Sequence, residues 1–324
     1  MNIKVKHCGK DLFTKVFFDF REIGVLVPLI VFMLLFTVQN SNFISMENIV
    51  NILRNTSFAL ISGVGMTFLL ITGAFDLSVG ALIAFSGVMT GLLMQAGVPI
   101  WLAISIGLIG SMLVGALNGF FCVKLNIPPF IAGIGMQYIL KGIVLVVQAG
   151  APVYPLPSAF NAIGAFEIIG IPLVVILAAV IAIIGHIVLK YTVFGRKLFA
   201  VGGNCETARL AGIRCDRIQY AAWIIVAVLT GISGILTAAR LASAQPTAGA
   251  SFELTVIAGC IIGGTSLFGG AGSILGTVLG AIFMNMMTNG MTIIKLSPYW
   301  QQLVLGIIII TSVAFDQFRV SRKV

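Results

Sequence analysis

Residues 77–123 read LSVGALIAFSGVMTGLLMQAGVPIWLAISIGLIGSMLVGALNGFFCV and contain no Lys, Arg, Asp or Glu. A helix that crosses a bilayer needs about 20 mainly apolar residues, so this run is long enough for two crossings joined by a turn. A second uncharged run covers residues 254–294. Both runs predict pairs of membrane-spanning segments.

The composition of the whole chain agrees with these runs. Of 324 residues, 59% are hydrophobic and 9% are charged. A soluble domain typically carries about 45–50% apolar and about 25% charged residues. The composition therefore excludes a soluble enzyme and predicts a polytopic membrane protein.

Ten apolar segments are candidate membrane spans. They are continuously apolar and lack the period-two alternation of outer-membrane strands, which favours helices. We expect an all-α fold with about ten transmembrane helices. The candidate spans are residues 22–38, 55–73, 77–95, 101–123, 129–148, 171–189, 218–239, 254–268, 273–290 and 299–316.

Basic residues are distributed unequally between the loops and indicate orientation. Their excess gives a net charge of +9, and cytoplasmic loops carry the excess Lys and Arg of a membrane protein. We therefore expect both termini and the loop after the sixth span in the cytoplasm, and no nucleic-acid partner. The opposite loops hold Arg54, Arg240 and Lys295. The basic residues of the cytoplasmic side are Lys4, Lys6, Lys10, Lys15, Arg21, Lys124, Lys190, Arg196, Lys197, Arg209, Arg214, Arg217, Arg319, Arg322 and Lys323.

The expected organisation has three parts. Residues 1–21 form a basic cytoplasmic arm, residues 22–318 form one transmembrane domain, and residues 319–324 form a cytoplasmic tail. The transmembrane domain includes the charged cytoplasmic loop 190–217. No A-x-A-like cleavage site follows the first apolar run, so we expect an uncleaved first span.

Motifs for nucleotide binding and catalysis do not occur in the sequence. It contains no G-x-x-x-x-G-K-[ST] phosphate loop, so we do not expect it to bind ATP through that motif. The two histidines are not near a Ser or Cys arrangement typical of a triad, and five scattered cysteines do not predict a metal site. We expect neither enzymatic activity nor a cofactor or metal on this chain.

An internal repeat relates the two halves of the sequence. FDLSV at residues 75–79 resembles FELTV at 252–256, and GALNG at 115–119 resembles GTVLG at 276–280. In the span count the first motif begins an outward span and the second an inward one. The order therefore predicts two inverted five-helix halves, an arrangement found in transporters.

Two motifs concern the fourth and fifth spans. Gly115-x-x-x-Gly119 is expected to pack two helices together, because small residues four apart let membrane helices approach closely. Pro128 and Pro129 are expected to break the helix between the two spans.

Polar residues within the apolar segments are candidates for the transport pathway or its gating. In GAFDLSVG (73–80), Asp76 is expected to cap the helix that follows, with direct substrate contact as the alternative. Glu253 is expected to cap the eighth span, and Asn118 to form a hydrogen bond between helices or to face a polar pathway. The glycine-rich stretch 263–272 predicts a tight turn. The candidates are Asp76, Ser78, Gly80, Asn118, Glu253, Thr265 and Ser266.

The longest charged loop, residues 192–217, predicts a docking element. Asn204 is suited to cap a short helix with Glu206 in its first turn, and Gly212 is suited to end it. A short capped helix with little lipid-facing surface favours contact with a cytosolic partner. The alternative is a solvated positive loop, which accounts for the charge of this segment and leaves its caps unexplained.

Four segments together resemble the permease subunits of sugar-type ABC importers, the ribose-transport permease family. They are GAFDLSVG, GALNGFFCVKLNIPPFIAG, FGRKLFAVGGNCETARLAGI and FELTVIAGCIIGGTSLFGGAGSILG. The chain departs from the family's usual residues at Ala74, Phe75, Gly133, Ala271 and Leu305.

The resemblance implies a bacterial inner-membrane subunit with several partners. It implies a second permease copy or a paralogue, an extracytoplasmic solute-binding protein, and cytosolic ATPase subunits that bind the ATP. It places a cytoplasmic coupling segment, which contacts the ATPase, at Gly195, Arg196, Gly202, Gly203, Asn204, Ala208 and Gly212.

The leading functional hypothesis is therefore a permease subunit that carries a small, ribose-like sugar across the membrane. An ion-driven secondary transporter of a small polar solute is the alternative, because inverted repeats occur there too. That alternative needs ion-binding or proton-relay groups, and the spans offer few charged residues.

Overall fold

The computed structural model describes residues 23–321. The basic arm expected for residues 1–21 and the last three residues of the expected tail lie outside the described residues. Within the described part, each apolar segment expected from the sequence contains a helix. The all-α fold class is confirmed.

Six of the described helices are long and apolar enough to cross a membrane. They are α3 (Met46–Ile71), α5 (Ile100–Gly119) with its π-helical extension η2 (Phe120–Lys124), α6 (Pro129–Gln148), α8 (Leu173–Tyr191), α11 (Cys215–Leu241) and α13 (Ile274–Ile293). The shorter apolar helices are α2 (Ile23–Gln39), α4 (Val79–Gln95), α12 (Phe252–Ile262) and α14 (Pro298–Ser321). Ten spans in two inverted halves therefore stay a prediction.

Short elements connect the long helices. The 3-10 helix η1 (Ser41–Ile44) precedes α3, and α9 (Val193–Gly203) and α10 (Cys205–Leu210) lie between α8 and α11. The helix α7 (Ser158–Ala165) and an antiparallel hairpin of β1 (Glu167–Ile168) and β2 (Ile171–Pro172) precede α8. The sequence analysis predicted neither α7 nor the hairpin, because both lie in a connection without a long apolar pattern.

Local sequence signals explain where several helices begin. Ser45 caps α3 by accepting a hydrogen bond from the Asn48 amide at 3.3 Å, and Ser273 caps α13 in the same way. The helix α6 begins at Pro129, a position where the missing amide proton costs no hydrogen bond. The predicted break at Pro128 and Pro129 is confirmed.

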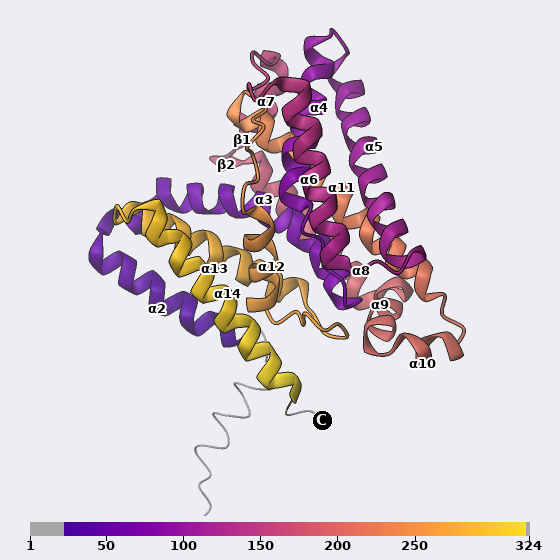
Figure 1. The fold of residues 1–324 in the computed structure, drawn as a ribbon. Coiled ribbons are helices and arrows are strands. Elements are labelled where there is room, and N and C mark those ends of the chain that lie inside the picture. Colours follow the sequence, from indigo (N-terminus) through magenta and orange to yellow (C-terminus); the bar gives the residue numbers. More distant parts are fainter. Residues whose placement is uncertain (1–22, 322–324) are drawn as a thin grey trace, which may run out of the picture.

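The molecule has two distinct ends (Figure 1). At one end lie α9, α10 and the end of α14, which we name the α10 end; at the other lie α7 and the hairpin, which we name the α7 end. The helices α4, α5, α6 and α11 run between them, and α2, α13 and α14 lie beside this group. The helix α3 connects the two groups because it contacts both α11 and α13.

Glycines allow α11 to approach α3 and α5 closely. A Cβ atom on Gly65 of α3 would lie 2.6 Å from the Cα atom of Val226, and one on Gly115 of α5 would lie 2.6 Å from the Cβ atom of Ala227. Gly119, one turn after Gly115, contacts Tyr220. The expectation that Gly115-x-x-x-Gly119 packs two helices together is confirmed.

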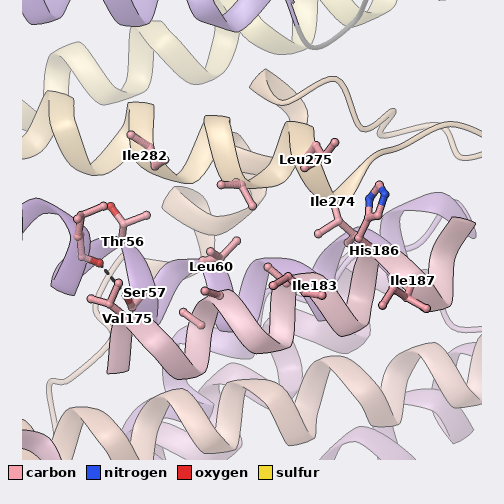
Figure 2. Close-up of a pocket in the computed structure, with 15 residues that line it drawn as sticks. Thr56, Ser57, Leu60, Val175, Ile183, His186, Ile187, Ile274, Leu275 and Ile282 are labelled. Carbon is pink, nitrogen blue, oxygen red and sulfur yellow. Dashed lines mark hydrogen bonds between the residues drawn. The ribbon is translucent and has the colours of Figure 1, made fainter. Parts of the chain in front are cut away.

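An apolar groove of about 380 Å³ lies between α3, α8 and α13. Figure 2 shows His186 at the end of the groove near Ile274, with Leu60 and Ile183 along its length. Large apolar side chains such as Ile183 and Leu275 are more than half exposed. Apolar surface of this extent is suited to contact with lipid, as expected for a multi-pass membrane protein.

Two basic residues expected in loops lie inside helices. Arg54 belongs to α3 and forms an ion pair with Glu167 of the hairpin at 2.6 Å, while Arg240 lies in the last turn of α11. The helices extend beyond the uncharged sequence runs because such partners satisfy the charges at the α7 end.

One of the repeat correspondences was wrong as a structural match. FDLSV and FELTV both lie where a short apolar helix begins, at α4 and α12. GALNG, however, forms the last turn of α5, whereas GTVLG lies in the first turns of α13. The second likeness reflects similar helix-packing glycines in both places and not an equivalent position.

Gly115→Ala should lower the thermal stability of the detergent-solubilised protein. The added methyl group would overlap α11, and overpacking a tight interior costs about 1–3 kcal/mol. Gly142→Ala on α6 is the matched control, because a Cβ atom there meets open space. Unfolding midpoints measured by fluorescence-detected size exclusion test the packing. Equal midpoints for the two variants would contradict it.

Candidate functional site

The segment between α8 and α11 forms a compact bend at the α10 end. The Thr192 hydroxyl donates to the Val188 carbonyl at 2.6 Å and accepts from the Gly195 amide at 3.2 Å, which ends α8 and starts α9. Gly195 is buried against the Leu189 carbonyl, where a side chain would overlap. Arg196 is exposed beside it. Gly195 is thus required for the sharp turn that places α9 against the helices.

The short helix α10 forms as the sequence predicts. Asn204 accepts a hydrogen bond from the Thr207 amide at 2.9 Å, and Gly212 follows the helix with a φ of +80°. Arg209 donates to Asp216 at 2.9 Å, which ties α10 to the first turn of α11 and raises the pKa of Arg209. Burial and the hydrogen bond with Cys215 raise the pKa of the Cys205 thiol to about 11, so this thiol is protonated at neutral pH.

The two faces of α10 differ in their surroundings. Ala208 is 4% exposed and lies in a cluster with Val201 and Cys215. Leu210 is 87% exposed. Ala208 therefore holds the helix in place, and Leu210, which the sequence analysis did not single out, is the apolar side chain that α10 presents outward.

The end of α9 makes a backbone contact with the end of α3 and with the loop between α12 and α13. A side chain on Gly202 would overlap the carbonyl oxygen of Ile71, and its Cβ atom would lie 2.7 Å from the amide nitrogen of Gly270. The Gly270 amide itself donates to the Ile71 carbonyl at 2.9 Å. We name this contact, with Gly73 and Gly269, the glycine junction. Gly203, the next residue, is exposed and faces open space.

The glycine junction joins three segments that are distant in sequence. A Cβ atom on Gly269 would lie 2.9 Å from the Gly202 carbonyl oxygen and 3.0 Å from the Gly73 amide nitrogen. Gly73 belongs to the loop between α3 and α4, and Gly269 and Gly270 belong to the loop between α12 and α13. The end of α9 therefore touches the loop between α12 and α13, and this loop in turn touches the loop between α3 and α4.

The loop between α12 and α13 is the tight turn that its glycines predict. The Thr265 amide donates to the Cys260 carbonyl at 3.0 Å, and the Ser266 amide donates to the Ala271 carbonyl at 2.9 Å. Ser266 also accepts from the Phe268 amide through its hydroxyl at 3.3 Å. Thr265 and Ser266 are both buried, so in this conformation they stabilise the turn.

A polar cluster fixes the other loop. Asp76 accepts hydrogen bonds from the Ser78 amide at 2.7 Å and the Ser78 hydroxyl at 2.6 Å. The side-chain amide of Asn118 donates to Asp76 at 3.3 Å and to Ser78 at 3.1 Å. All three side chains are fully buried. Asp76 does not cap α4 in the expected way, because Ser78 is the N-cap residue and the Asp76 carboxylate accepts from the Ser78 amide within the preceding loop. Asn118 joins α5 to this loop and not to another helix.

Glu253 does not cap α12 in the expected way. It lies within the first turn of α12, after Ser251, and accepts from the side chain of Gln137 on α6 at 3.0 Å. A Cβ atom on Gly80 would overlap this carboxylate and lie 2.5 Å from the Gly249 carbonyl oxygen. Gly80 therefore permits close contact between the start of α4 and the turn before α12. Gln137 was not among the predicted site residues, because a single glutamine on a span forms no recognisable pattern.

Comparison with known proteins identifies relatives along most of the chain. The family model described as branched-chain amino acid transport system / permease component matches residues 48–313. The ribose import permease protein RbsC of Haemophilus influenzae is 33% identical over 301 residues, which cover 92% of this chain and 93% of that protein. No solved structure matches the chain.

Two further relatives are named for other sugars. The D-allose transport system permease protein AlsC of Escherichia coli is 38% identical over 277 residues, 85% of each protein. The L-arabinose transport system permease protein AraH of Escherichia coli is 32% identical over 302 residues, which cover 93% of this chain and 92% of that protein. The resemblance noted from the four segments is confirmed, and the chain belongs to this family of transport permease components.

Proposed function

We propose that the chain forms the membrane pathway of a sugar importer driven by cytosolic ATPase subunits that dock on α10. The observation that carries the proposal is the glycine junction, which connects an exposed docking helix to two loops of the membrane domain. The names of the relatives, which refer to ribose, allose and arabinose, support a small sugar as the solute.

The proposed orientation places the α10 end in the cytoplasm. Arg196, Lys197, Arg209 and Arg214 lie on the segment between α8 and α11, and Arg217 lies in the first turn of α11. The positive-inside rule expects such an excess of basic residues on the cytoplasmic side. The α7 end would then face the extracytoplasmic binding protein. The proposal also includes ten spans in two inverted halves. It further includes a complex with a second permease copy or a paralogue.

The proposed mechanism uses α9 and α10 as one rigid element. Ala208, Val201 and Cys215 pack α10 against the end of α9 and the start of α11, so displacement of α10 by an ATPase would displace the end of α9. Gly202 would transmit this displacement to Ile71 and Gly270. Coupling between distant sites is physically sound where rigid elements with two arrangements connect them.

The motion would then reach both halves of the membrane domain. The loop after Ile71 carries Asp76 and Ser78, which are hydrogen-bonded to Asn118 at the end of α5. The loop with Gly270 connects α12 to α13. A single displacement at the junction would therefore shift helices of both halves together, which is what alternating access requires.

Reconstitution tests the proposed energy source. Proteoliposomes that contain the chain, its ATPase subunits and the binding protein should accumulate D-ribose, D-allose or L-arabinose only with ATP. A complex whose ATPase lacks its phosphate-loop lysine is the control and should accumulate none. Uptake by the chain alone, driven by a proton or sodium gradient, would contradict the proposal and favour the secondary transporter.

Leu210→Ser should weaken association with the ATPase about tenfold or more, because burying a leucine side chain contributes about 1.5–3 kcal/mol. Ile169→Ser is the matched control: Ile169 is 97% exposed at the α7 end. Co-purification of the ATPase with each variant measures the effect. Unchanged association for Leu210→Ser would place the docking surface elsewhere.

Gly202→Ala should uncouple ATP hydrolysis from transport. The methyl group would force the end of α9 away from the Ile71 carbonyl, and coupling energies of 1–3 kcal/mol correspond to a loss of about fivefold or more in uptake per ATP hydrolysed. Gly142→Ala on α6, outside the coupling segment, adds the same methyl group into open space and should keep the native ratio. Equal uptake per ATP hydrolysed in both variants would exclude the glycine junction as the coupling contact.

A further inference from the structure

A polar pocket of about 470 Å³ opens between α3, α11, α12 and α13. Its position is near the α7 end, because Arg240 of the pocket contacts Gly164 of α7 through its backbone. Volumes of about 300–1,000 Å³ are typical of pockets for small molecules. The polar side chains that the argument uses are Asn55, Thr237, Arg240, Asn285 and Thr288.

Arg240 is held in a defined position inside this pocket. It donates to the Asn55 side-chain oxygen at 2.6 Å, and its guanidinium carbon lies 5.6 Å from the centre of the Phe58 ring. A guanidinium group has five donor hydrogens, so donors remain beyond the bond to Asn55. The pocket therefore contains a fixed cationic donor group.

Side chains of α13 and α11 supply acceptors. The Thr288 hydroxyl donates to the Met284 carbonyl at 3.1 Å, and the Asn285 amide donates to the Ala281 carbonyl at 2.9 Å. The Thr237 hydroxyl donates to the Ser233 carbonyl at 2.7 Å. Each donation goes to the residue's own helix, which leaves the side-chain oxygens with lone pairs free to accept. Donors and acceptors in one pocket match the hydroxyl groups of a sugar, each of which both donates and accepts.

The apolar groove of Figure 2 provides a contrast within the same molecule. Its volume of about 380 Å³ is similar, but Leu60, Val175 and Ile183 line it where the polar pocket has amides and a guanidinium group. Hydroxyl groups would lose their hydrogen bonds with water there without replacement. Of these two spaces, only the polar pocket has the chemistry for a sugar.

One wall of the pocket is in contact with the start of α4. Gly249 and Phe252 line the pocket, and a Cβ atom on Gly249 would overlap the Gly80 carbonyl. Gly80 belongs to the first turn of α4, just after the Asp76–Ser78 cluster. Movement of the loop before α4 would therefore open or close the pocket toward the membrane interior.

We propose that this pocket is the site at which the permease itself recognises a monosaccharide before transport, with Arg240 as donor and Asn285 and Thr288 as acceptors. The proposal rests on the proposed function and adds sugar selectivity to the permease. It makes the start of α4 and the turn before α12 the barrier on the inner side of the site.

Thiol labelling tests the pocket without a transport measurement. Thr288→Cys in right-side-out vesicles should react with a membrane-impermeant maleimide added outside. The unsubstituted chain should react far less: among the described residues Cys215 and Cys260 are buried, and the partly exposed Cys122 and Cys205 lie toward the α10 end, which the proposed orientation places in the cytoplasm. D-ribose, D-allose or L-arabinose at saturating concentration should slow the reaction at least severalfold. The proposal would be overturned if Thr288→Cys reacted only after the vesicles were permeabilised. It would also be overturned if none of the three sugars changed the labelling rate.

Uptake kinetics provide the second readout. Thr288→Val and Asn285→Leu keep the side-chain size and remove acceptors, so each should raise the KM for sugar uptake about three- to tenfold, more than it lowers the maximal rate. Thr311→Val is the matched control, because the exposed Thr311 hydroxyl also donates a hydrogen bond to a carbonyl of its own helix, that of Ile307, at 2.8 Å. If Thr288→Val and Asn285→Leu had the same KM as Thr311→Val, recognition of the sugar in this pocket would be contradicted.

The two experiments separate the two proposals. If the unmodified complex shows no ATP-dependent uptake, the proposed function fails, while sugar protection of Thr288→Cys still establishes the pocket. If uptake requires ATP but the sugars do not slow labelling and the substitutions do not raise the KM, the pocket proposal is wrong and the proposed importer function is unaffected.

Discussion

The contact between the end of α9 and the carbonyl oxygen of Ile71 is the constraint on which the account of this permease depends. No side chain fits between Gly202, Ile71 and Gly270. A displacement of α9 therefore cannot be accommodated by side-chain rearrangement at this contact. Packed backbones transmit displacement because protein interiors are dense and resist compression. In the proposed mechanism these glycines therefore transmit movement and do not provide flexibility.

The polar groups of the membrane domain agree with an energy source outside the chain. Asp76 is buried and hydrogen-bonded by Ser78 and Asn118, and Glu253 is hydrogen-bonded by Gln137. Both carboxylates stabilise places where a loop meets a helix start. Both therefore make hydrogen bonds within the chain, and the proposed function assigns the driving force to the ATPase partners.

Sequence reasoning succeeded where the signal is local. Long apolar runs located the helices, Asn204 and Gly212 located the ends of α10, and Gly115-x-x-x-Gly119 indicated a helix contact. It did not predict the glycine junction, because Gly73, Gly202 and Gly270 come from three separate segments and each reads only as a turn or a helix end. The polar pocket was missed for the same reason: Asn55, Arg240 and Asn285 are ordinary residues of three different helices until the fold brings them together.

Distances between spin labels test the central claim, that α10 and the loop between α12 and α13 move together. Labels at Ala211→Cys and Phe268→Cys, both at exposed positions, should keep a constant separation between the nucleotide-free and ATP-bound complex. The separation between Phe268→Cys and Ile169→Cys at the α7 end should change. A change in the first distance with a constant second distance would show that α10 moves without the loop and would contradict the account.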